Sequence, residues 1–197
     1  RGTKKLSLGS QDVFWQKKGN YTGEVSPENL KKLGVEYTIV GHSERRKIAN
    51  ETDEMVNKKL LSLMQIGITP ILCVGETKSE RSKKLTKKII TRELSKGLKS
   101  IPRAKELIVA YEPIWAISKK GKGSSMDPDV IKAEIFYIRA TLKRLRVNQK
   151  VKRVSVLYGG SVSVDTISDI MKIPGVDGVL VGNASLSPDS FSKIALC

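Results

Sequence analysis

The side chains best suited to proton transfer stand directly after short apolar runs of this sequence. The only histidine of the chain, His42, opens the segment His-Ser-Glu-Arg-Arg after a β-branched run. Glu112 follows a second apolar run, and Trp115 lies just beyond it. A carboxylate shielded beside an indole can act as a general base, and a histidine can polarise a carbonyl group or move a proton. On position alone, structural roles stay open for both: a surface carboxylate and a packing histidine.

Two glycine turns after later apolar runs suit the binding of an anion. They are Gly159-Gly160-Ser161 and Gly182-Asn183. Glycine lets the backbone approach a ligand closely, and the amides at the start of a following helix attract negative charge. Each turn alone is ordinary, but the two follow consecutive apolar runs. We therefore interpret them as one phosphate site built from two loops.

The apolar runs that must position these residues are interpreted as six parallel strands. Each is rich in β-branched or large apolar residues and closes in a glycine or polar turn. They cover residues 5–9, 35–41, 69–75, 106–111, 153–158 and 177–181. Near-continuous apolar character is typical of parallel strands buried on both faces, and function then lies at their carboxyl ends.

A helix is predicted after every strand, from helical spacing of apolar residues and from capping residues. The helices are expected from Pro27, over 53–66, over 79–99, from Pro128, over 164–171 and from Pro188. No linker or shift in composition divides the chain, so residues 1–197 are predicted to form one α/β domain. Periodicity alone leaves both an open doubly wound sheet and a closed (β/α) barrel possible.

Composition excludes several classes of protein. The chain has 197 residues, of which 39% are hydrophobic and 28% charged, which is typical of a folded domain. Its apolar runs are too short for a membrane span. Cys73 and Cys197 form neither a disulfide scaffold nor a metal-ligand spacing, so we expect a cytoplasmic protein without a metal site.

The strong positive charge leaves a second class open. The formal net charge is +16, from 36 Lys and Arg against 20 Asp and Glu. Such a balance can indicate nucleic acid binding. Aromatic residues are only 5% of the chain, however, and no recognition motif is present. We expect no nucleic acid partner, and a basic surface that attracts acidic small substrates.

Taken together, these segments resemble the triosephosphate isomerase family. The resemblance rests on residues 41–46 (GHSERR), 110–117 (AYEPIWAI), 158–162 (YGGSV) and 177–186 (DGVLVGNASL), which occur in the order of the family. Residues 21–27 (YTGEVSP) and 70–76 (PILCVGE) resemble two further stretches. The resemblance implies the TIM (β/α)8 barrel. It also implies interconversion of D-glyceraldehyde 3-phosphate and dihydroxyacetone phosphate, in glycolysis and gluconeogenesis, without a cofactor.

The resemblance also implies residue roles. Glu112 would remove the proton from the carbon beside the carbonyl, and a neutral His42 would polarise the carbonyl, a pairing for which this family is itself the reference case. The supporting residues would be Ser43, which would help cap the next helix, Glu44 and Cys73. The phosphate would be bound by Ser118, Ser161, Gly182 and Asn183. The loop Thr22-Gly23-Glu24 would insert into a second subunit, which implies a homodimer.

The sequence also departs from the family. A complete barrel takes about 250 residues, and this chain is about 50 shorter. Its first strand resembles the third of the family, so we expect an N-terminally truncated, incomplete barrel of about six βα units. The family's asparagine-tryptophan-lysine stretch, whose lysine binds substrate, does not occur. Such a chain is expected to be poorly active alone and prone to associate. The alternative is a catalytically inactive fragment or interaction module that retains the fold.

Two smaller departures concern the phosphate. Residues 117–123 (ISKKGKG) replace the family's Ile-Gly-Thr-Gly pattern in the lid. Asn183 stands where the family usually has a second glycine, and asparagine tolerates left-handed backbone angles.

Overall fold

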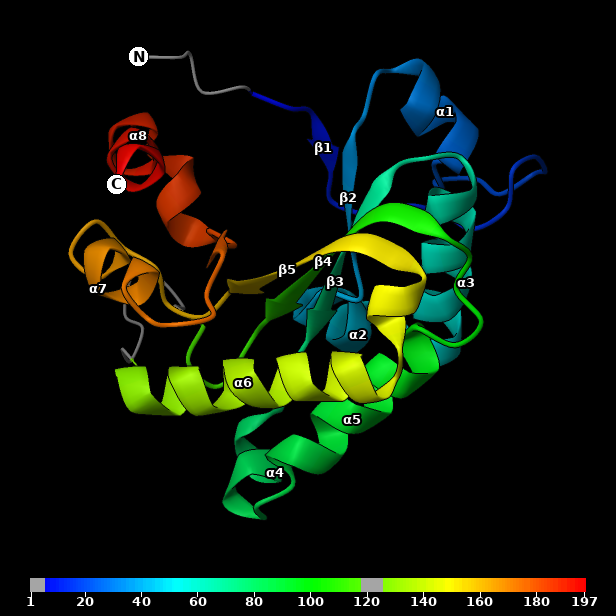
Figure 1. The fold of residues 1–197 in the computed structure, drawn as a ribbon. Coiled ribbons are helices and arrows are strands. Elements are labelled where there is room, and N and C mark those ends of the chain that lie inside the picture. Colours follow the sequence, from blue (N-terminus) through cyan, green and yellow to red (C-terminus); the bar gives the residue numbers. More distant parts are fainter. Residues whose placement is uncertain (1–5, 118–125) are drawn as a thin grey trace.

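The computed structural model describes residues 6–117 and 126–197, and its centre is one parallel sheet (Figure 1). The strands are β1 (Gly9–Ser10), β2 (Tyr37–Val40), β3 (Thr69–Val74), β4 (Ala104–Tyr111), β5 (Val151–Tyr158) and β6 (Gly178–Val179). Each strand pairs with the next in sequence order, and every pair is parallel. Within the described residues the sheet does not close, because β1 and β6 each have a single neighbouring strand. The predicted architecture of six βα units in an incomplete barrel is confirmed.

The helices alternate with the strands as predicted. They are α1 (Pro27–Lys32), α2 (Ser43–Ile48), α3 (Asp53–Gln65), α4 (Lys78–Ser82), α5 (Thr86–Gly97), α6 (Pro128–Arg144), α7 (Ile167–Met171) and α8 (Pro188–Leu196). Short 3-10 helices occupy Val147–Gln149 (η1) and Asn183–Leu186 (η2). The predicted cap residues Ser26, Asp127 and Ser187 each accept a backbone N–H of the first turn that follows them.

Some predicted boundaries were wrong. The single helix expected over 79–99 is two helices, α4 and α5, because the backbone at Lys84 turns left-handed with φ of 57°. The short α2 was not predicted. Of the first strand predicted over 5–9, residue 5 lies outside the described residues, and the strand observed is Gly9–Ser10. The sixth strand is limited to Gly178–Val179, and α7 begins only at Ile167. The two shortened strands lie at the ends of the sheet, where one partner alone sustains the hydrogen-bond ladder.

The main hydrophobic core lies between the sheet and the helices on its outer side. Helices α3, α5 and α6 run along that side and pack on one another and on β3 and β5 (Figure 1). Leu60 of α3, Leu94 of α5 and Ile135 of α6 are fully buried there. The core fixes the strand register, which pairs Cys73 with Ala110 and Tyr111 with Tyr158. The carboxyl ends of β3, β4 and β5 therefore lie at one edge of the sheet.

Candidate active site

The carboxyl edge of the sheet brings the two predicted proton-transfer residues into contact. His42 follows β2, and Glu112 follows β4. The imidazole Nε2 of His42 lies 3.1 Å from Oε1 of Glu112. The residues stand 70 positions apart in the chain, and the sheet topology places them side by side.

The environment of His42 favours one neutral tautomer. The backbone N–H of Glu44 donates to Nδ1 at 3.3 Å, so Nδ1 presents its lone pair and the ring proton lies on Nε2. The Glu112 carboxylate raises the pKa of His42 above its ordinary value, more than burial lowers it. In the neutral ring, His42 thus holds an N–H donor at Nε2, which faces Oε1 of Glu112.

Residues Ser43 and Glu44 support this pair through their backbone. Ser43 N–H donates to Oε2 of Glu112 at 3.2 Å. The N-cap of α2 is the His42 side chain, so the predicted capping role of Ser43 was wrong. The Glu44 carboxylate is 77% exposed and lies 3.9 Å from His42 Nδ1, whereas its backbone N–H makes the closer contact with the ring. Both N–H groups belong to the first turn of α2, where backbone donors have no partner within the helix; that of Ser43 points at the Glu112 carboxylate, and that of Glu44 at the His42 ring.

Close packing of backbone around Glu112 fixes its position. Glu112 is only 2% exposed, and its N–H donates to the Val74 carbonyl at 2.8 Å. A methyl group on Gly75 would lie 1.9 Å from the Glu112 carbonyl oxygen, and one on Gly159 would lie 3.1 Å from Glu112 Cγ. The position of Gly75 therefore requires glycine, and a side chain at Gly159 would press on the Glu112 side chain. Cys73 is fully buried next to this group, and burial together with Glu112 raises the pKa of its thiol.

A second buried carboxylate lies in the turn after β3 and had no predicted role. Glu76 accepts hydrogen bonds from the indole N–H of Trp115 at 2.8 Å, from the hydroxyl of Tyr111 and from the Arg81 guanidinium. The Arg81 guanidinium also stacks on the Trp115 ring, 4.4 Å from its centroid. Trp115 was predicted to shield Glu112, but its indole N–H donates to Glu76. The sequence signal that could have indicated Glu76 is a glutamate directly after a predicted strand.

The two predicted phosphate turns lie at the carboxyl ends of neighbouring strands. The turn of Gly159 and Gly160 follows β5, and β5 pairs with β6. Ser161 is half-buried in the same turn, and Gly182 and Asn183 lie at the start of η2. Asn183 begins this helix without left-handed backbone angles. Ser118 and the lid stretch 118–125 lie outside the described residues.

Within the described residues, no three histidine, cysteine, aspartate or glutamate side chains gather in a way that could hold a metal ion. In the same part of the chain, no helix has the length and apolar character needed to cross a membrane.

A parallel β/α fold with an acid–base pair and two glycine turns at one strand edge defines an enzyme of the (β/α) barrel class. Comparisons with known proteins narrow this class. The family model for triosephosphate isomerase matches residues 1–196. The triosephosphate isomerase of Thermoanaerobacter pseudethanolicus is 45% identical over 192 residues, covering 96% of this chain and 76% of that protein. The one from Caldanaerobacter subterraneus subsp. tengcongensis is 46% identical over 197 residues, covering 98% and 77%.

A solved structure from the same family is also similar to this chain. The crystal structure of triosephosphate isomerase from Bartonella henselae superposes with a TM-score of 0.86 at 30% identity, covering 96% of this chain and 76% of that one. The chain belongs to the triosephosphate isomerase family and has the fold of an isomerase.

Proposed function

We propose that Glu112 and His42 together carry the isomerisation of triose phosphates in this chain. Glu112 takes the proton from the carbon beside the substrate carbonyl, and the electron pair of that C–H bond forms the carbon–carbon double bond of an enediolate. The oxygen that gains negative charge receives the Nε2 proton of His42. The imidazole regains a proton from the neighbouring hydroxyl, and Glu112 returns its proton to the adjacent carbon. Aldose and ketose are interconverted without net gain or loss of atoms.

The observation that carries this proposal is the opposite role of the two nitrogens of His42. Its Nδ1 accepts the Glu44 N–H, and its Nε2 faces Glu112 at 3.1 Å. A neutral histidine with a fixed Nε2–H is a hydrogen-bond donor that matches a developing enediolate oxygen. The direct contact of His42 with Glu112 must open when substrate enters, because the substrate oxygen requires the same N–H.

The phosphate of the substrate binds at the turns after β5 and β6 in this proposal. Ser161, Gly182 and Asn183 supply hydrogen-bond donors there, and Ser118 of the lid completes the set. Backbone N–H groups at the start of a helix attract a dianion. The basic surface of the chain also draws an acidic substrate toward the site, since its net charge is +16.

The test is solvent proton exchange by the purified chain. Incubated with dihydroxyacetone phosphate in D₂O, the chain should form glyceraldehyde 3-phosphate and incorporate deuterium at the carbon next to the carbonyl. Substitution Glu112→Gln should lower both rates by about 10² to 10⁴, because it removes the base. Substitution Glu54→Gln, at an exposed carboxylate, serves as the matched control. Undiminished exchange in Glu112→Gln would show that another group is the base.

We also propose a homodimer formed through the loop that carries Thr22 and Gly23. Its base is closed by a hydrogen bond from Phe14 N–H to the Val25 carbonyl, and its tip is exposed with Gly23 at φ of 89°. An exposed, preformed loop suits insertion into a second subunit. Sedimentation of the chain and of a Thr22→Asp variant tests this: the variant should shift toward monomer, and equal association would refute the loop contact. A single domain and a cytoplasmic location stay predictions.

A further inference from the structure

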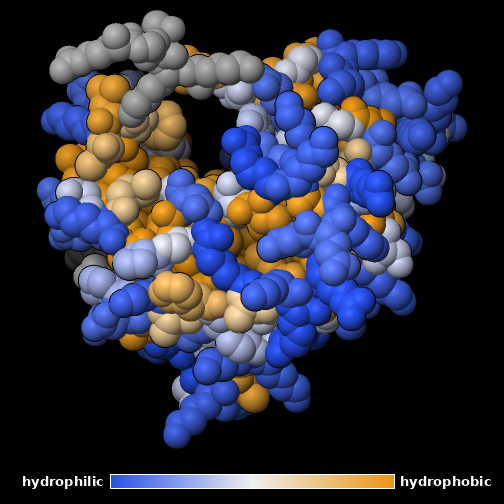
Figure 2. All heavy atoms as spheres, in the orientation of Figure 1, coloured by the Kyte–Doolittle hydropathy of each residue, from blue (hydrophilic) through white to orange (hydrophobic). Residues whose placement is uncertain are grey.

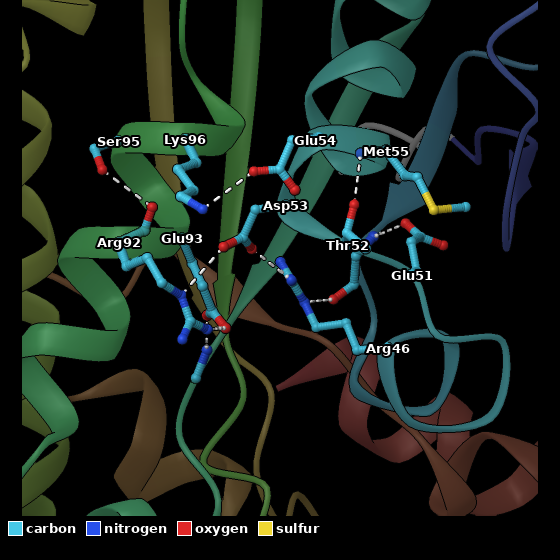
Figure 3. A network of polar contacts seen from close by, with 12 residues as sticks. Arg46, Glu51, Thr52, Asp53, Glu54, Met55, Arg92, Glu93, Ser95 and Lys96 are labelled. Atoms are coloured by element: carbon cyan, nitrogen blue, oxygen red, sulfur yellow. Dashed lines mark hydrogen bonds and ion pairs between the residues drawn. The ribbon is translucent and has the colours of Figure 1, made fainter.

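A partly buried ionic network outside the reacting groups connects the turns that carry them. Arg46 donates from Nε to the Gly41 carbonyl at 2.8 Å, directly before His42 in the chain. Through Nη1 it also donates to Asp53 at 2.7 Å. One end of the network therefore lies on the backbone that precedes His42. Figure 3 shows Arg46 reaching toward Asp53, with Arg92 and Glu93 on the other side of Asp53.

The other end of the network lies on the turn that supports Glu112. Asp53 accepts from Arg92 Nε at 3.1 Å, and Arg92 donates from Nη2 to Glu93 Oε1 at 3.1 Å. The second oxygen of Glu93 accepts the N–H of Gly75 at 2.9 Å. Gly75 packs against the Glu112 carbonyl so closely that no side chain fits between them. The carbonyl groups on either side of Gly75, those of Val74 and Glu76, accept the N–H groups of Glu112 and Ile114.

We propose that Glu93 is a positioning residue for the isomerisation, which holds the Gly75 turn and, through Arg92, Asp53 and Arg46, keeps Glu112 in register with His42. This inference rests on the proposed function, because it assumes that Glu112 and His42 are the reacting pair. Glu93 lies on α5 and is 3% exposed, so it reaches Gly75 from the helix layer and touches no substrate.

The charge of Glu93 is suited to such a role and sensitive to pH. Its pKa is raised to about 7: burial is the largest cause and the charge of Asp53 adds to it, whereas Arg46, the Gly75 N–H and Arg92 oppose the rise. The charged groups that face Glu93 come from three helices: Arg46 of α2, Asp53 of α3 and Arg92 of α5. Near neutral pH the anion holds both Gly75 and Arg92, and protonation weakens this link.

The single histidine makes the geometry measurable without turnover. The contact with Glu112 raises the pKa of His42, so an NMR titration of its one imidazole reports how closely Glu112 is held. Substitution Glu112→Gln should lower this pKa, because it removes the neighbouring charge. Substitution Glu93→Gln should lower it also, because the Gly75 turn loosens and Glu112 moves away. An unchanged value in Glu112→Gln would overturn the proposed site itself and not only this inference.

Two further variants separate positioning from charge. Glu93→Asp keeps the negative charge and shortens the side chain, so a positioning role predicts the same fall in the pKa of His42 as Glu93→Gln. Glu54→Gln is the matched control, because Glu54 pairs with Lys96 between the same two helices but at the exposed surface. If the pKa of His42 were unchanged in Glu93→Asp but lowered in Glu93→Gln, the effect would come from the charge of Glu93 acting through space, and the positioning role would be wrong. An unchanged pKa of His42 in both variants would also refute the positioning role.

Kinetics of the same variants provide the second readout. Glu93→Gln and Glu93→Asp should lower kcat on the order of tenfold and leave KM within about twofold, because the substrate contacts are kept. The kcat of the unmodified chain should fall as pH decreases through about 7, and Glu93→Gln should lack that step. A raised KM with an unchanged kcat would refute the positioning role of Glu93. So would a fall of kcat through about pH 7 that persists in Glu93→Gln. Thermal unfolding of each variant verifies that it is folded.

Discussion

At the scale of single residues, the candidate active site depends on glycines that let the backbone and side chain of Glu112 pack closely against neighbouring strands. Glu112 stays in place because Gly75 and Gly159 allow its carbonyl and its side chain to approach. Ser43 and Glu44 act through N–H groups, which any residue in the first turn of α2 would present. The chemistry of the pair therefore depends on backbone geometry as much as on the two side chains.

Substitution Gly75→Ala should destabilise the fold by about 2 to 3 kcal/mol, because overpacking forces the backbone apart. The added methyl group would lie 1.9 Å from the Glu112 carbonyl oxygen. Urea unfolding measures the change. Gly97→Ala is the control: its methyl group would meet atoms at 3.6 Å or more in a helix, so stability should hold or rise slightly. Equal stability of the two variants would contradict this account.

At the scale of secondary structure, the clearest surprise is the break between α4 and α5. The apolar stripe that predicted one helix, from Leu85 to Leu98, lies entirely after the break, and Lys84 adopts φ of 57°. A capping box of Thr77 and Glu80 starts α4, and the left-handed residue lets α5 begin in a new direction. Leu85 then enters α5 without a side-chain cap.

Substitution Lys84→Gly should raise the free energy of unfolding by about 0.5 to 1 kcal/mol, because glycine adopts left-handed angles without steric cost. The neighbouring Lys83 has φ of −85°, so Lys83→Gly should lower stability by a similar amount through chain entropy. Chemical denaturation of both variants tests the backbone assignment. A higher free energy of unfolding in Lys83→Gly with a lower one in Lys84→Gly would contradict the left-handed backbone at Lys84.

At the scale of the whole molecule, hydrophilic surface dominates the face shown in Figure 2, and apolar patches interrupt it on the left, in the region of α8. Exposed large hydrophobic residues flank the two end strands of the sheet, among them Leu8 before β1 and Leu186 after β6. The end strands and these residues account physically for the predicted tendency to associate.

The buried Glu93 should make stability depend on pH. Its pKa is about 7 in the folded chain against 4.5 for a free carboxyl, so the folded state binds the proton more tightly. The contribution to stability is fully present below pH 4.5 and is lost as pH rises through about 7, on the order of 3 kcal/mol in all. Unfolding free energies measured from pH 4.5 to 8 should fall less steeply in Glu93→Gln, whereas Glu54→Gln should keep the slope of the unmodified chain. Parallel curves for all three proteins would contradict the burial argument.

Most of the fold could be predicted from the sequence because parallel strands buried on both faces leave a plain apolar signal. Residues 69–75 matched β3, residues 153–158 matched all of β5 except its first two residues, and Pro128 began α6 as its cap indicated. The break at Lys84 could not be predicted, because a lysine gives no local signal for left-handed backbone. Glu76 and Glu93 were missed for a related reason: their partners are distant backbone and side-chain groups that sequence spacing does not reveal.

By itself, the sequence determined the order of the units, the residues that follow each strand and the family resemblance. All three depend on local pattern and motif. Only the tertiary structure decided that His42 and Glu112 lie 3.1 Å apart, that Trp115 bonds Glu76, and that a partly buried ionic network links Gly41 to Gly75. The physical reason is that these contacts join different strands and helices, and their geometry is set by sheet register and core packing.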